Sequence, residues 1–197
     1  MNELVLPSTL EEIKDYFMYD YADDTSFNIN YNNSYAVMTI KPTLPSNLKK
    51  IGAHGFSLDR VAASGSWELP DSIEELGHGA FYIPRTISDK GVTFNVKFGS
   101  GLTKLRGAPF YTYLGGIVKY KYFVYDFRKS TAIPTLTTAS LIGMRGKTYN
   151  SSTSTVYTEE TDVLTIIVPD ELYDEWKAAT NWVKYASCFK KASEVTE

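Results

Sequence analysis

The stretch Leu69–Phe81, which reads LPDSIEELGHGAF, decides the fold. Two aliphatic residues, Ile73 and Leu76, stand three positions apart, and the aromatic Phe81 follows a glycine-containing turn. A segment this short cannot bury its own apolar side chains and must pack against neighbouring copies of itself. The stretch therefore predicts a repeat protein, provided that the chain contains further copies.

Three other segments match the pattern without gaps. Leu6–Ile13 and Leu44–Ile51 keep both the leading Leu-Pro and the aliphatic spacing, whereas Phe98–Leu105 keeps the spacing and lacks the proline. Equivalent residues of successive repeats stack on one another in such folds, so the matches predict three ladders of core side chains. These ladders are Leu10, Leu48, Ile73 and Leu102; Ile13, Ile51, Leu76 and Leu105; and Met18, Phe56, Phe81 and Phe110.

The spacing of the repeats suggests the type of fold. Successive central aliphatics are 38, 25 and 29 residues apart, and about 25 residues suit one leucine-rich coil. The longer first interval predicts an insertion at about residues 20–38, of the kind that forms a loop on one face of a solenoid, often the binding face. Glycines lie between the aliphatic pairs and the aromatics, where the chain reverses. We expect an α/β repeat fold, a short leucine-rich-repeat solenoid, with its coils in residues 1–115.

The pattern changes in residues 116–197. Aromatic and β-branched residues in Ile117–Phe127 predict one or two strands, and Ile133–Leu136 interrupts the pattern. The Ser- and Thr-rich residues 147–162 are expected to form an exposed loop, followed by a buried strand at Leu164–Val168. Helices are predicted from Pro169 and over Trp182–Ala192. This part is expected to be a mixed strand and helix module that caps the core at its C-terminal end.

These motifs resemble a known family. The repeat Leu69–Phe81 closely resembles the BspA-type leucine-rich repeats of bacterial surface proteins and phage structural proteins. The stretches Phe127–Leu136 and Val168–Trp182 resemble the terminal module that follows such repeats, and the resemblance covers nearly all of residues 5–194. Tyr16–Met18 and Pro109 depart from the pattern. The resemblance implies adhesion or assembly, with no catalytic residues and no cofactor.

Composition and charge exclude several function classes. The net charge is −3, with 20 basic and 23 acidic residues, so no basic patch for nucleic acid is expected. The single cysteine, Cys188, excludes an intramolecular disulfide and is interpreted as a small core residue. No apolar run approaches the roughly 20 residues of a membrane-spanning helix, and Met1–Leu4 does not resemble the start of a secretory signal.

Several residue groups invite a functional interpretation, and for each a simpler one is favoured. His54 and His78 are too few ligands for a metal site and are expected to be solvent-side turn residues. The Asp20–Asp24 segment lacks the spacing of a calcium loop, and Gly99–Lys104 lacks the Gly-Lys-Ser/Thr ending of a phosphate loop. Ser64–Ser66 has no nucleophile elbow around it. No catalytic residue and no metal site is therefore nominated.

The aromatic residues form the one retained candidate for a binding surface. With 15 tyrosines and 10 phenylalanines, the chain has more rings than three ladders can bury. Two interpretations fit: the surplus rings cover the edges of the core, or they form a patch that contacts a protein or a glycan. The candidate binding residues are Trp67, Tyr82, Tyr111, Tyr113, Tyr120 and Tyr122, with Tyr125 beside them.

Three functions fit these observations. The first is a non-enzymatic bacteriophage virion protein (a fibre, decoration or tail-associated protein), which is made in the host cytoplasm and displays one face to a host surface protein or glycan. The second is a bacterial cell-surface adhesin, and the third is a glycan-acting enzyme with two carboxylates about 5 to 10 Å apart. No capping domain is seen before Leu6, so we expect the first repeat's apolar edge to be covered by another virion protein or by self-association.

Overall fold

The aliphatic pairs of the repeats lead into very short parallel strands. The computed structural model describes residues 4–18, 41–58, 65–83, 92–112, 120–138, 145–148, 156–159 and 164–196, and the first five of these ranges are called the first to fifth repeats. One two-residue strand from each repeat enters a five-stranded parallel sheet, the short-strand sheet. In order, its strands are β1 (Glu12–Ile13), β2 (Lys50–Ile51), β5 (Glu75–Leu76), β8 (Lys104–Leu105) and β11 (Thr135–Leu136).

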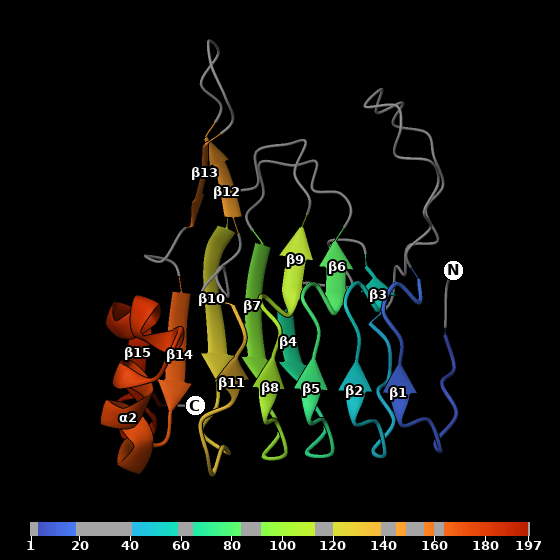
Figure 1. The fold of residues 1–197 in the computed structure, drawn as a ribbon, viewed down its shortest axis with the longest axis horizontal. Helices are drawn as coiled ribbons and strands as arrows, with labels where there is room; N and C mark the ends of the chain where they lie inside the picture. Colours follow the sequence, from blue (N-terminus) through green and yellow to red (C-terminus); the bar gives the residue numbers. More distant parts are fainter. Residues whose placement is uncertain are drawn as a thin grey trace.

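Two further parallel sheets accompany the short-strand sheet. One follows the order β15 (Phe189–Lys191), β14 (Leu164–Val168), β10 (Tyr120–Asp126), β7 (Val92–Lys97) and β4 (Gly65–Glu68). The other contains β3 (Phe56–Ser57), β6 (Phe81–Ile83) and β9 (Phe110–Thr112). Figure 1 shows successive repeats side by side along the long axis, with β1 near one end and α2 at the other. The described residues thus form an α/β structure with parallel sheets and few helices.

The register of the short-strand sheet is the one that the repeats predict. Ile13 pairs with Ile51, Ile51 with Leu76, and Leu76 with Leu105, and all four side chains are buried. Each isoleucine or leucine points into the core, while the preceding residue points outward, because side chains alternate along a strand. The predicted second ladder is therefore confirmed.

The aromatic ladder is also confirmed over three repeats. The rings of Phe56, Phe81 and Phe110 stack with centroid separations of 5.7 and 4.8 Å. Trp67 on β4 packs its indole against two of them, at 4.7 Å from Phe81 and 5.3 Å from Phe110. Met18, the first member of the predicted ladder, is half-buried against the same core. These rings join the three sheets through one apolar interior.

One prediction for the C-terminal part is incomplete, and another is wrong in detail. Ile133–Leu136 lies beyond the end of β10, as expected of a stretch that interrupts the strand pattern, but it also contains the unpredicted strand β11, in which Leu136 pairs with Leu105 and extends the ladder by a fifth member. Within residues 147–162, the expected exposed loop, the described residues include part of an antiparallel hairpin, β12 (Arg145–Thr148) and β13 (Val156–Glu159). The predicted insertion at residues 20–38 lies outside the described residues.

The helices near the C-terminus are shorter than predicted. Asp170–Leu172 forms a 3₁₀ turn that continues into α2 (Tyr173–Ala178), as expected after Pro169. The second predicted helix, Trp182–Ala192, is a 3₁₀ segment over Trp182–Cys188, and then the chain extends as β15 before a last 3₁₀ turn at Ala192–Glu194. Cys188 is buried, as predicted. No helix among the described residues is long and apolar enough to span a membrane.

The C-terminal segment covers the β11 edge of the short-strand sheet. Its side chains supply the hydrogen-bond donors that the backbone of a sixth repeat would otherwise supply. Backbone amides of the fifth repeat bond to Thr103 O and Leu105 O of the fourth. The equivalent carbonyls of the fifth repeat accept hydrogen bonds from side chains instead: Asn181 Nδ2 donates to Leu136 O at 2.6 Å, and Trp182 Nε1 donates to Pro134 O at 2.7 Å. Buried carbonyls need such partners, so these two side chains cap the edge of the sheet.

Candidate interaction site

The turns after the first three short strands each hold one residue in a backbone conformation that residues other than glycine rarely adopt. The third residue after the ladder aliphatic has a positive φ in the first three repeats: 60° at Tyr16, 52° at His54 and 62° at Gly79. Glycine adopts this left-handed conformation at little cost, whereas other residues lose about 1–2 kcal/mol. A tyrosine and a histidine therefore occupy positions that suit glycine, and such local strain is common at functional sites.

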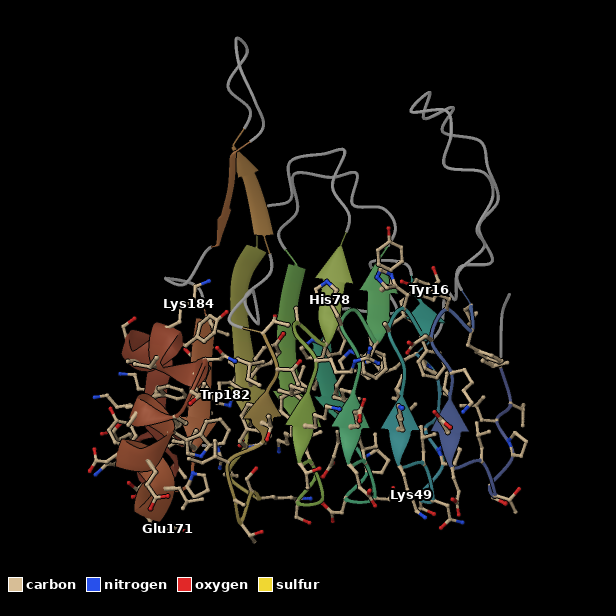
Figure 2. The ribbon with its side chains drawn as sticks, viewed as in Figure 1. Tyr16, Lys49, His78, Glu171, Trp182 and Lys184 are labelled. Atoms are coloured by element: carbon tan, nitrogen blue, oxygen red, sulfur yellow. The ribbon has the colours of Figure 1, made fainter. Side chains whose placement is uncertain are left out.

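Four side chains gather at this turn and are called here the turn cluster: Tyr16, His54, His78 and Tyr82. The rings of Tyr16 and His54 stack at 5.3 Å with an interplanar angle of 12°. His54 also lies 4.7 Å from the Tyr82 ring and 6.2 Å from the His78 ring. Figure 2 shows Tyr16 and His78 on the same side of the molecule, beyond the short strands. His54 is thus the centre of the cluster.

Stacking of the repeats positions the cluster. Tyr16 N donates to Ala53 O at 2.7 Å, and His54 N donates to His78 O at 3.2 Å. The Asp15 carboxylate accepts a hydrogen bond from Ala53 N at 2.7 Å. Because each turn is bonded to the turn of the next repeat, the rings are held in a fixed row across the first three repeats.

The residues of the turn cluster differ in their exposure to solvent. Tyr16 is 47% exposed and its neighbour Phe17 is 55% exposed, whereas Tyr82 is buried. His54 and His78 both lie in turns, as predicted, but both are half-buried, and His54 packs between the Tyr16 and Tyr82 rings and does not face the solvent as expected. Tyr16 and Phe17 can therefore meet a partner, while Tyr82 supports His54 from below.

Burial keeps the central imidazole neutral. Desolvation lowers the pKa of His54 from 6.5 to about 4, the charge of a protonated His78 acts in the same direction, and the Asp15 carboxylate opposes both. Because the imidazole under the Tyr16 ring is neutral, the centre of the turn cluster is aromatic and carries no positive charge at neutral pH. Such a surface suits ring contacts with a protein or a sugar rather than binding of an anion.

Charged residues flank the cluster in an alternating row. On the outward face of the short-strand sheet, Glu12 lies 3.4 Å from Lys50, Lys50 lies 3.9 Å from Glu75, and Glu75 lies 3.2 Å from Lys104. Opposite charges in directly paired positions favour this register of the strands. The row therefore stabilises the stacking that carries the cluster, and it presents a surface of mixed charge.

The expectation that Trp67 and Tyr82 are surface aromatics is wrong. Trp67 is 3% exposed, because it packs on the stacked phenylalanines and the Lys41 ammonium lies 4.7 Å from its ring centroid. Tyr82 is 6% exposed beneath His54, and Tyr125 is fully buried in the core. For these three residues, the interpretation that surplus rings cover the core is the correct one.

The other predicted binding residues are not brought into one described site. Tyr111 belongs to β9, and Tyr120 and Tyr122 belong to β10, but the structure describes only their backbone. Tyr113 lies outside the described residues. The sequence prediction missed Tyr16 and Phe17, although Tyr16 stands at the same distance from Ile13 as His54 does from Ile51.

Chemically, the turn cluster offers aromatic contact area together with two imidazoles and two phenol hydroxyls. The described residues include no group of three or more His, Cys, Asp or Glu side chains that could hold a metal ion. The chain gives no significant match to the protein-family models, the curated proteins or the solved structures with which it was compared. The geometry of the turn cluster and the resemblance of the repeats to BspA-type sequences are therefore the observations that bear on function.

Proposed function

We propose that this chain is a BspA-type leucine-rich-repeat solenoid that serves as a non-enzymatic structural protein of a bacteriophage particle. It would act as a fibre, decoration or tail-associated component, and its turn cluster would contact a protein or a glycan. The observation that carries the proposal is the in-register pairing of Ile13, Ile51, Leu76, Leu105 and Leu136 in the short-strand sheet. Each repeat adds one strand to this sheet and one layer to the core, as expected of a solenoid.

The closed end of the sheet supports the same architecture. A solenoid needs an element that covers the last repeat, because an open end exposes both apolar core and unpaired backbone groups. Here Trp182 is buried, and its indole donates to Pro134 O, one of the two carbonyls that a sixth strand would have used. The terminal segment therefore has the properties of a cap.

The exposed rings of the first repeat support a contact function. Tyr16 and Phe17 are large side chains that remain about half exposed. The backbone at Tyr16 adopts a strained left-handed conformation and holds its ring in this exposed position. Aromatic rings give contact area at low entropic cost, and they are enriched where proteins bind partners. A rigid row of repeats that presents such rings suits attachment to a surface.

The proposal is tested by particle association. A lysate of the source culture is separated on a density gradient, and antibody against the protein is used to follow it through particle and membrane fractions. The proposal predicts that the protein bands with the phage particles and resists a high-salt wash. Recovery of the protein with cell envelopes, and its absence from washed particles, would contradict the proposal and favour a cell-surface adhesin.

A further inference from the structure

The two ends of the short-strand sheet differ. At the β11 end, Asn181 and Trp182 occupy the edge carbonyls. At the other end, β1 pairs only with β2, and no strand among the described residues pairs with its outer edge. Three of the four exposed large hydrophobic residues that the structure describes, Val5, Tyr16 and Phe17, belong to the same first repeat; the fourth is Val183. The edge of β1 that no described strand covers therefore belongs to the same repeat as these three exposed apolar side chains.

The hydrogen bonds between the first two repeats show which amides and carbonyls of the first repeat face away from β2. Lys50 N and Gly52 N donate back to Glu11 O and Ile13 O of the first repeat. The amides at the equivalent positions of the first repeat, those of Glu12 and Lys14, therefore point to the outer edge. The Glu12 carbonyl points the same way, because successive carbonyls alternate along a strand.

We infer that the first repeat is a dimer interface, where β1 of one chain pairs with β1 of a second copy in antiparallel orientation about a two-fold axis at Ile13. In this register Lys14 N of each copy donates to the Glu12 carbonyl of the other, and the two Ile13 side chains meet on the core side. The inference goes beyond the proposed particle function and does not depend on it, because it rests only on the edge geometry of the described residues.

Charge favours this register over its neighbours. Glu12 of one copy faces Lys14 of the other, so that two opposite-charge pairs form across the interface, next to the Lys14–Glu12 and Lys50–Glu12 ion pairs that each chain already contains. A shift of the register would place Glu12 opposite Glu12, or Lys14 opposite Lys14. The next residues outward, Glu11 and Asp15, would face each other, but each already has a cation of its own chain nearby, Lys49 at 3.2 Å and Arg106 at 3.5 Å.

The covered β11 edge favours a second copy in two-fold contact over a filament. Head-to-tail stacking would require the β11 edge of one copy to pair with β1 of the next, and the cap occupies that edge. A two-fold contact uses the same open edge of both copies and closes after two chains. The edge geometry therefore points to a dimer.

The test is the mass of the full chain in solution, measured by sedimentation equilibrium over a range of concentrations. The wild type is expected to be a dimer. Glu12→Lys and Lys14→Glu each place like charges across the interface, and each should raise the dimer Kd by about tenfold or more. The double variant Glu12→Lys/Lys14→Glu restores opposite charges and should return the Kd toward that of the wild type.

Two controls separate a loss of dimerisation from other effects of the charge changes. Glu171→Lys makes the same charge change at the far end of the molecule from Tyr16 (Figure 2) and should leave the Kd unchanged. Lys14 is 78% exposed, so Lys14→Glu should keep the fold, whereas Glu12→Lys also removes the Glu12–Lys50 ion pair within the chain; circular dichroism and urea denaturation would check the fold of both variants. A monomeric wild type would overturn the inference and leave a different protein as the partner of this edge. A dimer whose Kd responds to neither single variant, or that the double variant does not restore, would also overturn it.

Discussion

Arg106 of the fourth repeat reaches Asp15 of the first repeat, with Nη1 of the guanidinium 3.5 Å from Oδ1 of the carboxylate. The contact crosses the turns of the two repeats in between. It is possible because the positions equivalent to Arg106 in those repeats are Gly52 and Gly77, which carry no side chain. A single ion pair thus ties together turns that lie far apart in the sequence.

This ion pair should contribute a small, salt-sensitive coupling to stability. Both side chains are about 40% exposed, at 39% for Arg106 and 42% for Asp15, so screening limits the coupling energy to about 0.5 kcal/mol. Asp15→Ala alone should cost more than Arg106→Ala, because Asp15 also accepts the Ala53 amide. A double-mutant cycle by urea denaturation measures the coupling, which should disappear in 1 M salt. A coupling that high salt leaves unchanged would show that the two charges do not interact directly.

Close approach of the turns requires glycine at position 77. A Cβ on Gly77 would lie 2.3 Å from Ala53 N and 2.4 Å from Gly52 C, so the stacked turns would have to separate. We expect Gly77→Ala to lower the free energy of unfolding by about 2–3 kcal/mol, in the range of overpacked cores. Thermal and urea denaturation of both this variant and the wild type provide the measurement.

Gly65 supplies the matched control for that substitution. Its φ is +88°, but a Cβ there would meet no atom within 4 Å. Gly65→Ala should therefore cost only the backbone strain of a positive φ, about 1 kcal/mol. Gly77 itself has no positive φ, so a loss in Gly77→Ala no larger than that in Gly65→Ala would mean that the contact between neighbouring turns does not require glycine.

Stability should fall as the pH drops below the ordinary pKa of histidine. The pKa of His54 is lowered from 6.5 to about 4 in the folded chain, so the unfolded state takes up a proton first as the pH decreases. The stabilising contribution of the neutral imidazole is complete above pH 6.5 and is lost progressively toward pH 4. His54→Asn, which tolerates the positive φ and carries no proton, should remove this dependence between pH 6.5 and 5.

The same residue can be followed directly. The ring protons of His54, assigned by comparison with the His54→Asn variant, should titrate by NMR with a midpoint near 4. A midpoint at the ordinary value of 6.5 would contradict the packing of this ring between Tyr16 and Tyr82. The stability profile would then need another titrating group.

Of the two side-chain hydrogen bonds that cap the sheet, the one from the Trp182 indole should contribute measurably to stability. Trp182→Phe removes the donor to Pro134 O and leaves a buried carbonyl without its partner, which should cost about 1–3 kcal/mol beyond the loss of ring area. Trp176→Phe is the matched control, because Trp176 is also fully buried and its Nε1 has no hydrogen-bond partner among the described residues. Urea denaturation should show the larger loss for Trp182→Phe. Similar losses would mean that the two rings act only by packing.

The repeat pattern predicted the register of the short-strand sheet because each repeat carries the same local signal. The spacing of Ile73, Leu76 and Phe81 recurs, and stacked repeats bring equivalent residues together whatever the intervening loops contain. The repeat pattern did not predict the fifth strand, because a proline stands between Ile133 and Leu136 and no other repeat has a proline between its two aliphatics. The proline is tolerated because Thr103 O, the carbonyl that an amide at position 134 would share with its neighbour, still accepts a hydrogen bond from Thr135 N.

The site was harder to predict than the fold. Composition showed that aromatic residues are in surplus, but it could not tell which rings the core buries. Trp67 is buried because β4 turns it onto Phe81 and Phe110, and only the packing of two sheets determines that. Tyr16 is displayed because a left-handed turn directs it onto His54, and backbone angles of this kind are not visible in the residue type.

Immunogold electron microscopy of a lysate of the source culture, with antibody against this protein, tests whether the protein belongs to a phage particle. The proposed function predicts gold label on phage particles, and its position on head or tail would distinguish a decoration protein from one that contacts the host. Label on intact cell envelopes together with bare particles would contradict the virion assignment.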